Sequence, residues 1–167
     1  MEQGKFLDIV DEQDQVIGQA EIEEAHNKHL LHRSVHTFII NSEGKLFVAQ
    51  RSFRGKRYAG RWTIPGRHAP AGKAYEETAE SMLVDTFGGI SCELKMIGKH
   101  RAEDSVENEI TAVYIGEADK VNLNKEVFET GKFLIVEEVR KLSTQKNATP
   151  YLGNALELYK KYKSENK

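Results

Sequence analysis

The fold is restricted most by a strand–turn–strand pattern in the first third of the chain. The run SVHTFIIN, residues 34–41, precedes the turn sequence SEGK, residues 42–45, and the run LFVAQR, residues 46–51, follows it. β-branched and aromatic residues favour strands, and a short Gly-containing segment between two such runs favours a hairpin turn. The pattern therefore predicts a β-hairpin, and with it a fold built on a sheet.

Other patterns along the chain predict more strands than helices. Strands are expected at residues 5–22 (two, around an acidic turn), 61–64, 92–100, 108–118 and 131–136. Helices are expected at residues 74–87, 137–142 and 152–165, the first because apolar residues recur at four-residue spacing ahead of Gly88. Residues 23–32, which carry three histidines, read as a helical turn or an ordered loop. The sequence predicts an α+β fold in a single domain over residues 1–167.

Composition restricts the function classes. The chain has 167 residues, is 39% hydrophobic and 30% charged, and carries a net charge of -2, which is typical of a globular protein without a nucleic-acid footprint. A single cysteine excludes an internal disulfide and favours a reducing compartment. The N-terminal residues lack the pattern of a signal peptide, and no apolar run is long enough for a membrane span. We expect a cytoplasmic protein with no nucleic-acid or membrane partner.

Several segments, taken in order, resemble a known family. These are VDEQDQVIG (10–18), LHRSVHTFIINSEGKLFVAQRS (31–52), the Trp62 strand, the Gly-rich entry to the helix at 74–87, and ENEI (107–110). Together they resemble the Nudix superfamily and, within it, the isopentenyl-diphosphate isomerase-like branch, over roughly Leu7 to Gly116. The resemblance implies the Nudix fold, an α+β fold in which a mixed β-sheet is sandwiched between α-helices. It also allows a homodimer, which is common among Nudix proteins.

The Nudix signature, G-x5-E-x7-R-E-U-x-E-E-x-G-U with U a bulky apolar residue, uses its glutamates to bind a divalent metal. Gly72 and Gly88 align this chain with the pattern, and Asp85 is then the one acid near the final glutamate pair, one carbon shorter than Glu. The other polar positions have changed to Lys73, Ser81, Met82 and Thr86. The resemblance therefore predicts a degenerate Nudix box: a helix that keeps its structural role and loses most of its metal-binding role, with Asp85 as its remaining candidate metal ligand.

The isomerase-like branch has a second metal site, built from histidines and an E-x-E pair. His32 and His68 stand where that branch places metal-ligating histidines, and Glu107 and Glu109 match its E-N-E element. Residues two apart in a strand point to the same face, so both carboxylates can reach one ion. Two imidazoles with two carboxylates suit Mn²⁺, Zn²⁺ or Fe²⁺ better than Mg²⁺. The cofactor expected from the resemblance is a divalent metal, Mn²⁺ or Mg²⁺.

One further histidine of that site falls on Ala25 in this chain. His26 and His29 lie close by, and the sequence leaves open which of them substitutes.

The resemblance also implies a phosphate-binding group at Arg51 and Lys56, with Arg54 alongside. Guanidinium groups bind phosphate oxygens in pairs, whereas Lys acts as a point charge.

These residues allow three functions. The first is a metal-dependent hydrolase of a small diphosphate-containing compound, such as a nucleoside diphosphate derivative, in which Glu107 and Glu109 bind the metal and polarise water. The second is a catalytically inactive module that binds a phosphorylated ligand. The third is an isopentenyl-diphosphate isomerase, which the sequence disfavours because the family pattern W-T-N-S-x-C-x-H reads Trp62-Thr63-Ile64-Pro65-Gly66-Arg67-His68 here, without the cysteine.

Overall fold

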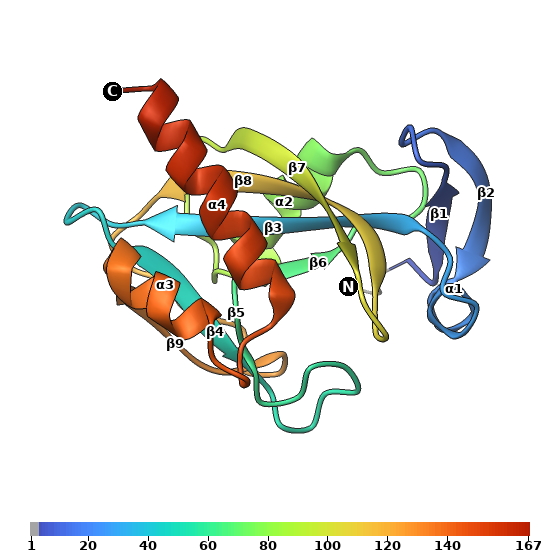
Figure 1. Cartoon of the computed structure of the whole chain (residues 1–167), viewed down its shortest axis with the longest axis horizontal. Helices are drawn as coiled ribbons and strands as arrows, with labels where there is room; N and C mark the ends of the chain where they lie inside the picture. Colours follow the sequence, from blue (N-terminus) through green and yellow to red (C-terminus); the bar gives the residue numbers. More distant parts are fainter. Residues whose placement is uncertain (1–3) are drawn as a thin grey trace.

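The computed structural model describes residues 4–167, which form nine strands and four helices (Figure 1). The strands are β1 (Phe6–Val10), β2 (Val16–Glu21), β3 (His32–Ile40), β4 (Leu46–Arg51), β5 (Trp62–Thr63), β6 (Gly66–His68), β7 (Lys95–Glu103), β8 (Asn108–Glu117) and β9 (Phe128–Leu134). The helices are α1 (Ile22–Asn27), α2 (Tyr75–Asp85), α3 (Val136–Ser143) and α4 (Pro150–Glu165). Each strand and helix predicted from the sequence is present, with bounds that differ by a few residues.

Strand β3 organises a mixed sheet. Along one edge it runs parallel to β8 over its whole length, with His32 opposite Glu109. Along the other edge it meets β1, β6 and β4 in turn, all antiparallel. The predicted hairpin is therefore a hairpin only at its turn, where Ile40 pairs with Leu46. Because β6 occupies the edge of β3 from Ser34 to His36, β4 diverges and pairs with β5 and β9 instead.

The alternation of side chains along β3 builds two cores, one on each face of the sheet. Val35 and Ile39 pack with the buried residues of α2, whereas Phe38 and Ile40 pack with those of α3 and α4. In Figure 1, α4 crosses one face of the strands and α2 lies on the other. Successive residues of a strand point to opposite faces, so one strand contributes to both cores. The sheet is thus sandwiched between helices.

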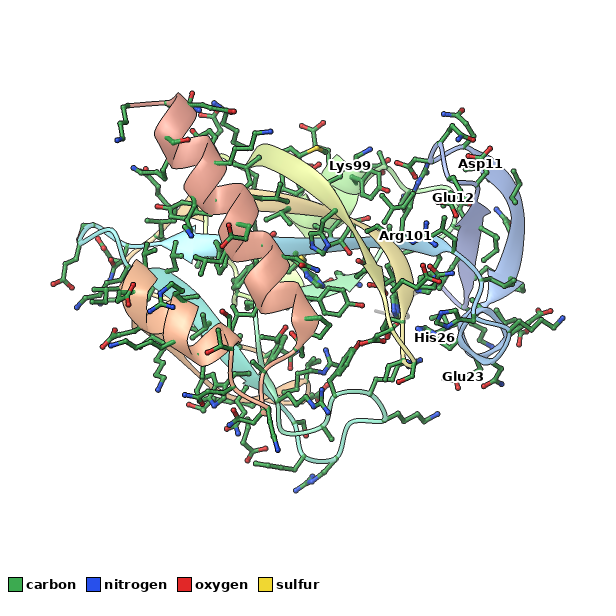
Figure 2. The ribbon with its side chains drawn as sticks, in the orientation of Figure 1. Asp11, Glu12, Glu23, His26, Lys99 and Arg101 are labelled. Carbon is green, nitrogen blue, oxygen red and sulfur yellow. The ribbon has the colours of Figure 1, made fainter. Side chains whose placement is uncertain are left out.

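The turn between β1 and β2 is fastened to the rest of the sheet by charged side chains (Figure 2). Lys99 of β7 lies with its Nζ 2.9 Å from Asp14 Oδ2, and Arg101 Nη1 lies 2.5 Å from Glu12 Oε2. Arg33 Nε of β3 donates to Asp14 Oδ1 at 2.7 Å.

Over residues 4–167, no helix combines the length and the apolar composition needed to cross a bilayer.

Candidate metal centre and adjoining cavity

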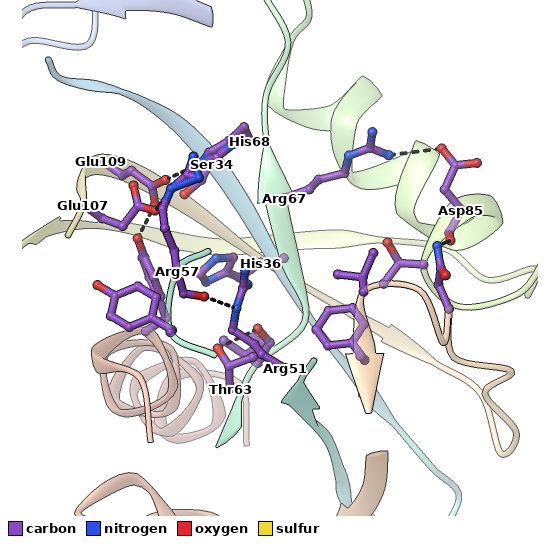
Figure 3. Close-up of a pocket in the computed structure, with 18 residues that line it drawn as sticks. Ser34, His36, Arg51, Arg57, Thr63, Arg67, His68, Asp85, Glu107 and Glu109 are labelled. Atoms are coloured by element: carbon purple, nitrogen blue, oxygen red, sulfur yellow. Dashed lines mark hydrogen bonds and ion pairs between the residues drawn. The ribbon is translucent and has the colours of Figure 1, made fainter. Parts of the chain in front are cut away.

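Five side chains from separate parts of the chain converge at one end of β3. They are His26 of α1, His32 of β3, His68 of β6, Glu107 in the loop before β8, and Glu109 of β8. Their ligand atoms all lie within 4.8 Å of one another. Strand register explains the convergence: β8 places Glu109 opposite His32, and β6 places His68 opposite Ser34, two residues further along β3. Figure 3 shows His68, Glu107 and Glu109 side by side.

Backbone carbonyls fix the orientation of two of the imidazoles. His26 Nδ1 lies 2.7 Å from the Ile22 carbonyl oxygen, and His32 Nδ1 lies 2.8 Å from that of Leu30. A carbonyl oxygen only accepts, so Nδ1 of His32 carries the hydrogen. His26 Nδ1 also lies 3.2 Å from Arg57 Nη2, which only donates, so the carbonyl alone does not fix the tautomer of His26. In both rings Nε2 faces a carboxylate of the cluster. A carbonyl behind the imidazole is the usual arrangement of a metal-ligating histidine.

Glu109 is buried among hydrogen-bond donors. It is 2% exposed, its Oε1 lies 3.2 Å from Nε2 of both His32 and His68, and its Oε2 accepts from the Tyr151 hydroxyl at 2.6 Å. Burial alone would raise the pKa of Glu109, but the hydrogen bonds and charges of His32 and His68 outweigh it and lower the pKa well below its usual range. Glu109 is therefore an ionised carboxylate.

Glu107 is the second buried carboxylate, 5% exposed. Its Oε2 lies 2.8 Å from His26 Nε2, and its Oε1 lies 3.5 Å from Arg57 Nε. Two buried carboxylates require nearby positive charge. Three inward-facing imidazole nitrogens with two carboxylate oxygens form a donor set that fits a divalent cation, and the mixture of nitrogen and oxygen suits Mn²⁺, Zn²⁺ or Fe²⁺.

The structure selects His26 as the third histidine of this cluster. Ala25, the position that the resemblance indicates, is fully buried against β1 and β2 in a small apolar core. The next residue of α1 therefore faces the cluster. His29 lies elsewhere, with its Nε2 4.0 Å from Glu103 Oε1.

A cavity of about 220 Å³ opens beside the cluster and is lined by Glu107, Glu109 and His68. Three arginines, Arg51, Arg57 and Arg67, also line it. Arg51 is mostly enclosed, and its Nε donates to the Arg57 carbonyl oxygen at 3.0 Å. Burial lowers the pKa of Arg51, and within residues 4–167 no carboxylate lies within ion-pair distance of it. A buried guanidinium of this kind is a binding group for an anion.

The other two predicted phosphate-binding residues point elsewhere. The side chain of Lys56 is 77% exposed, and its Nζ lies 3.6 Å from Glu23 Oε1. Arg54 is exposed on the same loop and does not line the cavity. Arg57 points inward in their place, so only Arg51 of the predicted trio reaches the cavity.

Asp85 lies on the opposite wall of the cavity from the carboxylates of Glu107 and Glu109 (Figure 3). Its Oδ2 lies 3.1 Å from Arg67 Nη1. The structure therefore keeps this predicted metal ligand apart from the His/Glu cluster and places its carboxylate against a guanidinium.

His36 and Tyr151 line the cavity and were not singled out from the sequence. The His36 ring packs edge-on against Tyr151, with ring centroids 4.4 Å apart. The Cδ2 atom of His36 lies 1.7 Å from the point that a Cβ on Gly66 would occupy. Burial lowers the pKa of His36 to about 3, so the ring is neutral. Residues 32, 34 and 36 share one face of β3, which is the signal that could have identified His36.

Sequence comparison finds similar curated proteins. An isopentenyl-diphosphate Delta-isomerase of Serratia proteamaculans is 31% identical over 118 residues, 67% of this chain and 65% of that protein, slightly less than two thirds of its length. Isopentenyl-diphosphate Delta-isomerase 2 of Photorhabdus laumondii is 30% identical over 72% of this chain and 73% of that protein. An uncharacterized Nudix hydrolase of Pseudomonas aeruginosa is 26% identical over 92% of this chain and 90% of that protein. No family model matches the chain.

Solved structures share the architecture. A crystal structure from Deinococcus radiodurans has a TM-score of 0.74 at 19% identity, covering 91% of this chain and 97% of that one. The MutT protein of Methanosarcina mazei has a TM-score of 0.68 at 19% identity, covering 82% and 96%. The NUDIX domain of Shewanella oneidensis NrtR, solved with ADP-ribose, has a TM-score of 0.58 at 15% identity, covering 78% and 86%. These similarities confirm the predicted α+β fold.

Proposed function

We propose that this chain, which belongs to the Nudix superfamily and to its isopentenyl-diphosphate isomerase-like branch, is a metal-dependent hydrolase of a small diphosphate-containing compound. The observation that carries the proposal is the set of five ligand atoms within 4.8 Å of one another beside an arginine-lined cavity. Metal ligands beside the guanidinium group of Arg51, which has no carboxylate partner among the described residues, suit a diphosphate, whose oxygens bind both. A nucleoside diphosphate derivative is one compound of this class.

The residues of the site divide the chemistry among them. The proposed metal ligands are His26, His32, His68, Glu107 and Glu109, and a divalent cation held there supplies Lewis acidity toward phosphate oxygens. Arg51 binds the diphosphate and neutralises the charge of the leaving phosphate.

Hydrolysis forms a bond between the oxygen of water and phosphorus, and it breaks the bond from phosphorus to the bridging oxygen. The proton released by water passes to a carboxylate. Glu107 Oε1 is the best placed acceptor, because its neighbour Arg57 Nε lies at 3.5 Å, whereas both oxygens of Glu109 already accept shorter hydrogen bonds. Glu107 is thus the proposed general base, and Glu109 is the proposed anchor of the cluster.

The size of the cavity limits the ligand. About 220 Å³ is less than the roughly 300–1,000 Å³ of pockets that enclose a drug-sized molecule. A diphosphate with a small organic group fits this volume, and a larger group would extend beyond the mouth.

A phosphate-release assay with a panel of diphosphate compounds and Mn²⁺ tests the proposal. The panel includes nucleoside diphosphate sugars, dinucleotides and isopentenyl diphosphate, the last also assayed for isomerisation. We expect turnover of at least one compound by the wild type, a loss of about 100-fold or more in Glu107→Gln, and full activity in the exposed control Glu43→Gln. Equal turnover by wild type and Glu107→Gln would contradict the assignment.

A second function, binding of a phosphorylated ligand without turnover, is favoured by the pairing of Asp85 with Arg67, which neutralises the one acid near the end of α2. Ligand binding with no product from any compound would support it. Isomerase activity remains disfavoured, because the single cysteine, Cys92, does not line the cavity.

A further inference from the structure

The far wall of the cavity carries a guanidinium in an unusual setting. Arg67 of β6 reaches across to α2, where its Nη1 lies 3.1 Å from Asp85 Oδ2 and 3.0 Å from Ser81 Oγ. The side chain is only 12% exposed, and its Nε is buried without a hydrogen-bond partner among the described residues. Buried polar groups usually have a hydrogen-bond partner, so a bound ligand is a candidate acceptor for the hydrogen of Arg67 Nε.

The three arginines of the cavity differ in what they face. Arg57 lies within 3.6 Å of two carboxylates, those of Glu23 and Glu107. Arg67 points toward α2 in Figure 3 and forms its one ion pair among the described residues with Asp85. The His/Glu cluster and Arg67 thus line the same cavity, with Arg67 on its α2 side.

Asp85 is poorly suited to hold a metal ion in this arrangement. Hard divalent cations need several oxygen ligands, and the neighbouring α2 positions Ser81 and Met82 offer no carboxylate. A cation bound at Asp85 would also lie within a few ångströms of the Arg67 guanidinium, and charges of the same sign at that separation repel strongly. The Asp85 carboxylate is better explained as the group that orients Arg67.

We infer that Arg67 is a phosphate-binding residue that supplies a fixed positive charge on the α2 side of the cavity, where no metal ion is needed. The inference rests on the proposed function, since it assigns a second phosphate group of the same diphosphate ligand. A planar guanidinium binds two phosphate oxygens at once, and Arg67 has Nε and one further nitrogen free to do so while Nη1 stays on Asp85. Asp85 then competes with the ligand for this charge.

Asp85→Asn gives the sharpest test, because the two roles of Asp85 predict opposite signs. The probe is methylenediphosphonate, a diphosphate analogue that resists hydrolysis, titrated by calorimetry with and without Mn²⁺. If Asp85 competes for Arg67, removing its charge tightens binding of the probe by about two- to tenfold. If Asp85 ligates a metal, the same change weakens binding in the presence of Mn²⁺.

Arg67→Ala is the companion variant, and Arg140→Ala is its control, since Arg140 pairs with Glu137 on α3 and does not line the cavity. We expect Arg67→Ala to weaken binding of the probe about tenfold or more and to leave Mn²⁺ binding in the absence of the probe unchanged, with no effect in Arg140→Ala. Asp85→Asn conserves the shape of the side chain, so the probe titration of this variant still tests the inference if Arg67→Ala does not fold.

The metal-free titrations separate this inference from the proposed function. Loss of probe affinity in Arg67→Ala without any Mn²⁺ binding by the wild type would leave Arg67 assigned and would remove the hydrolase. Unchanged affinity in Arg67→Ala, or weaker binding in Asp85→Asn with Mn²⁺ present, would overturn the assignment of Arg67.

Discussion

At the scale of single residues, the chemistry of the site depends on how two buried side chains are satisfied. Glu109 keeps its charge because His32, His68 and Tyr151 surround both of its oxygens. His36 keeps its position because Gly66 leaves room for the ring. Each contact can be tested by a single substitution.

Tyr151→Phe removes the donor to Glu109 Oε2 and leaves a buried carboxylate oxygen unsatisfied. We expect the free energy of unfolding to fall by about 1–3 kcal/mol, measured by urea titration. Tyr159→Phe on the same helix is the control, because no hydrogen bond joins its hydroxyl to the described residues, although its ring is also buried. Similar losses in both variants would show that the bond to Glu109 contributes nothing specific.

Gly66→Ala places a methyl group 1.7 Å from His36 Cδ2, so the imidazole has to move. Overpacking of this kind costs about 1–3 kcal/mol of unfolding free energy. In the double variant Gly66→Ala/His36→Ala the clash is absent, and we expect the two changes to be non-additive in a double-mutant cycle. Additive losses would mean that the two residues do not share this space.

At the scale of strands and helices, periodicity predicted the elements but not their partners. The two-residue spacing of Glu107 and Glu109 at the start of β8 predicts that their side chains share a face, and their carboxylates do converge, although Glu107 lies just before the strand. The pattern around the turn at residues 42–45 predicted a long hairpin, whereas β6, far along the chain, occupies that edge of β3. Pairing between distant strands leaves no local signal in one sequence, which is why the hairpin was overextended.

The same limit applies to the site. The resemblance to the isomerase-like branch predicts His32, His68, Glu107 and Glu109. The choice of His26 over His29 depends on which side of a six-residue helix packs against β1, and the inward turn of Arg57 depends on the path of a loop. No local pattern in the sequence indicates a role for Arg67, because its partner, Asp85, lies on a different element.

Asp14 fastens the β1–β2 turn to β3, β7 and α2 and predicts a dependence of stability on pH. Burial alone would raise the pKa of Asp14, but hydrogen bonds from Arg33, Lys99 and Tyr75 outweigh it and lower the pKa. A lowered pKa in the folded state adds stability above the pKa of the unfolded chain, about 3.9, and this stability is lost as pH falls through the folded-state value.

Asp14→Asn should therefore lower the unfolding free energy by about 1–3 kcal/mol at pH 7, and the difference from wild type should shrink below about pH 4. Urea titrations at a series of pH values measure this. Asp11→Asn, in the same turn, is the comparison, because Asp11 Oδ1 accepts from the backbone N–H groups of Gln13 and Gln15, as an Asn oxygen also can, and Asp11 forms no ion pair among the described residues. A difference that is constant from pH 7 to pH 2 would contradict the role of the Asp14 charge.

At the scale of the whole molecule, the candidate metal centre exists only when the chain is folded. Its five ligands come from segments spread between residues 26 and 109, and the folded chain brings their ligand atoms within 4.8 Å of one another. An ion that binds this cluster and not the unfolded chain stabilises the fold in proportion to its affinity.

Mn²⁺ at 100 times its dissociation constant should stabilise the folded protein by about 2.7 kcal/mol, which raises the melting temperature by roughly 5–10 °C for a chain of this size. A chelator should reverse the shift. In His26→Ala we expect most of the shift to disappear, whereas His29→Ala, which alters a half-exposed histidine outside the cluster, should keep it. An equal shift in both variants would place the ion elsewhere.

The most direct measurement is a calorimetric titration of Mn²⁺ into the wild type, His68→Ala and Glu107→Gln. We expect one ion per chain, bound with a dissociation constant on the order of micromolar in the wild type, and loss of that binding in both variants. No binding to the wild type, even with methylenediphosphonate present, would contradict a metal centre at this cluster, and with it the proposed hydrolase.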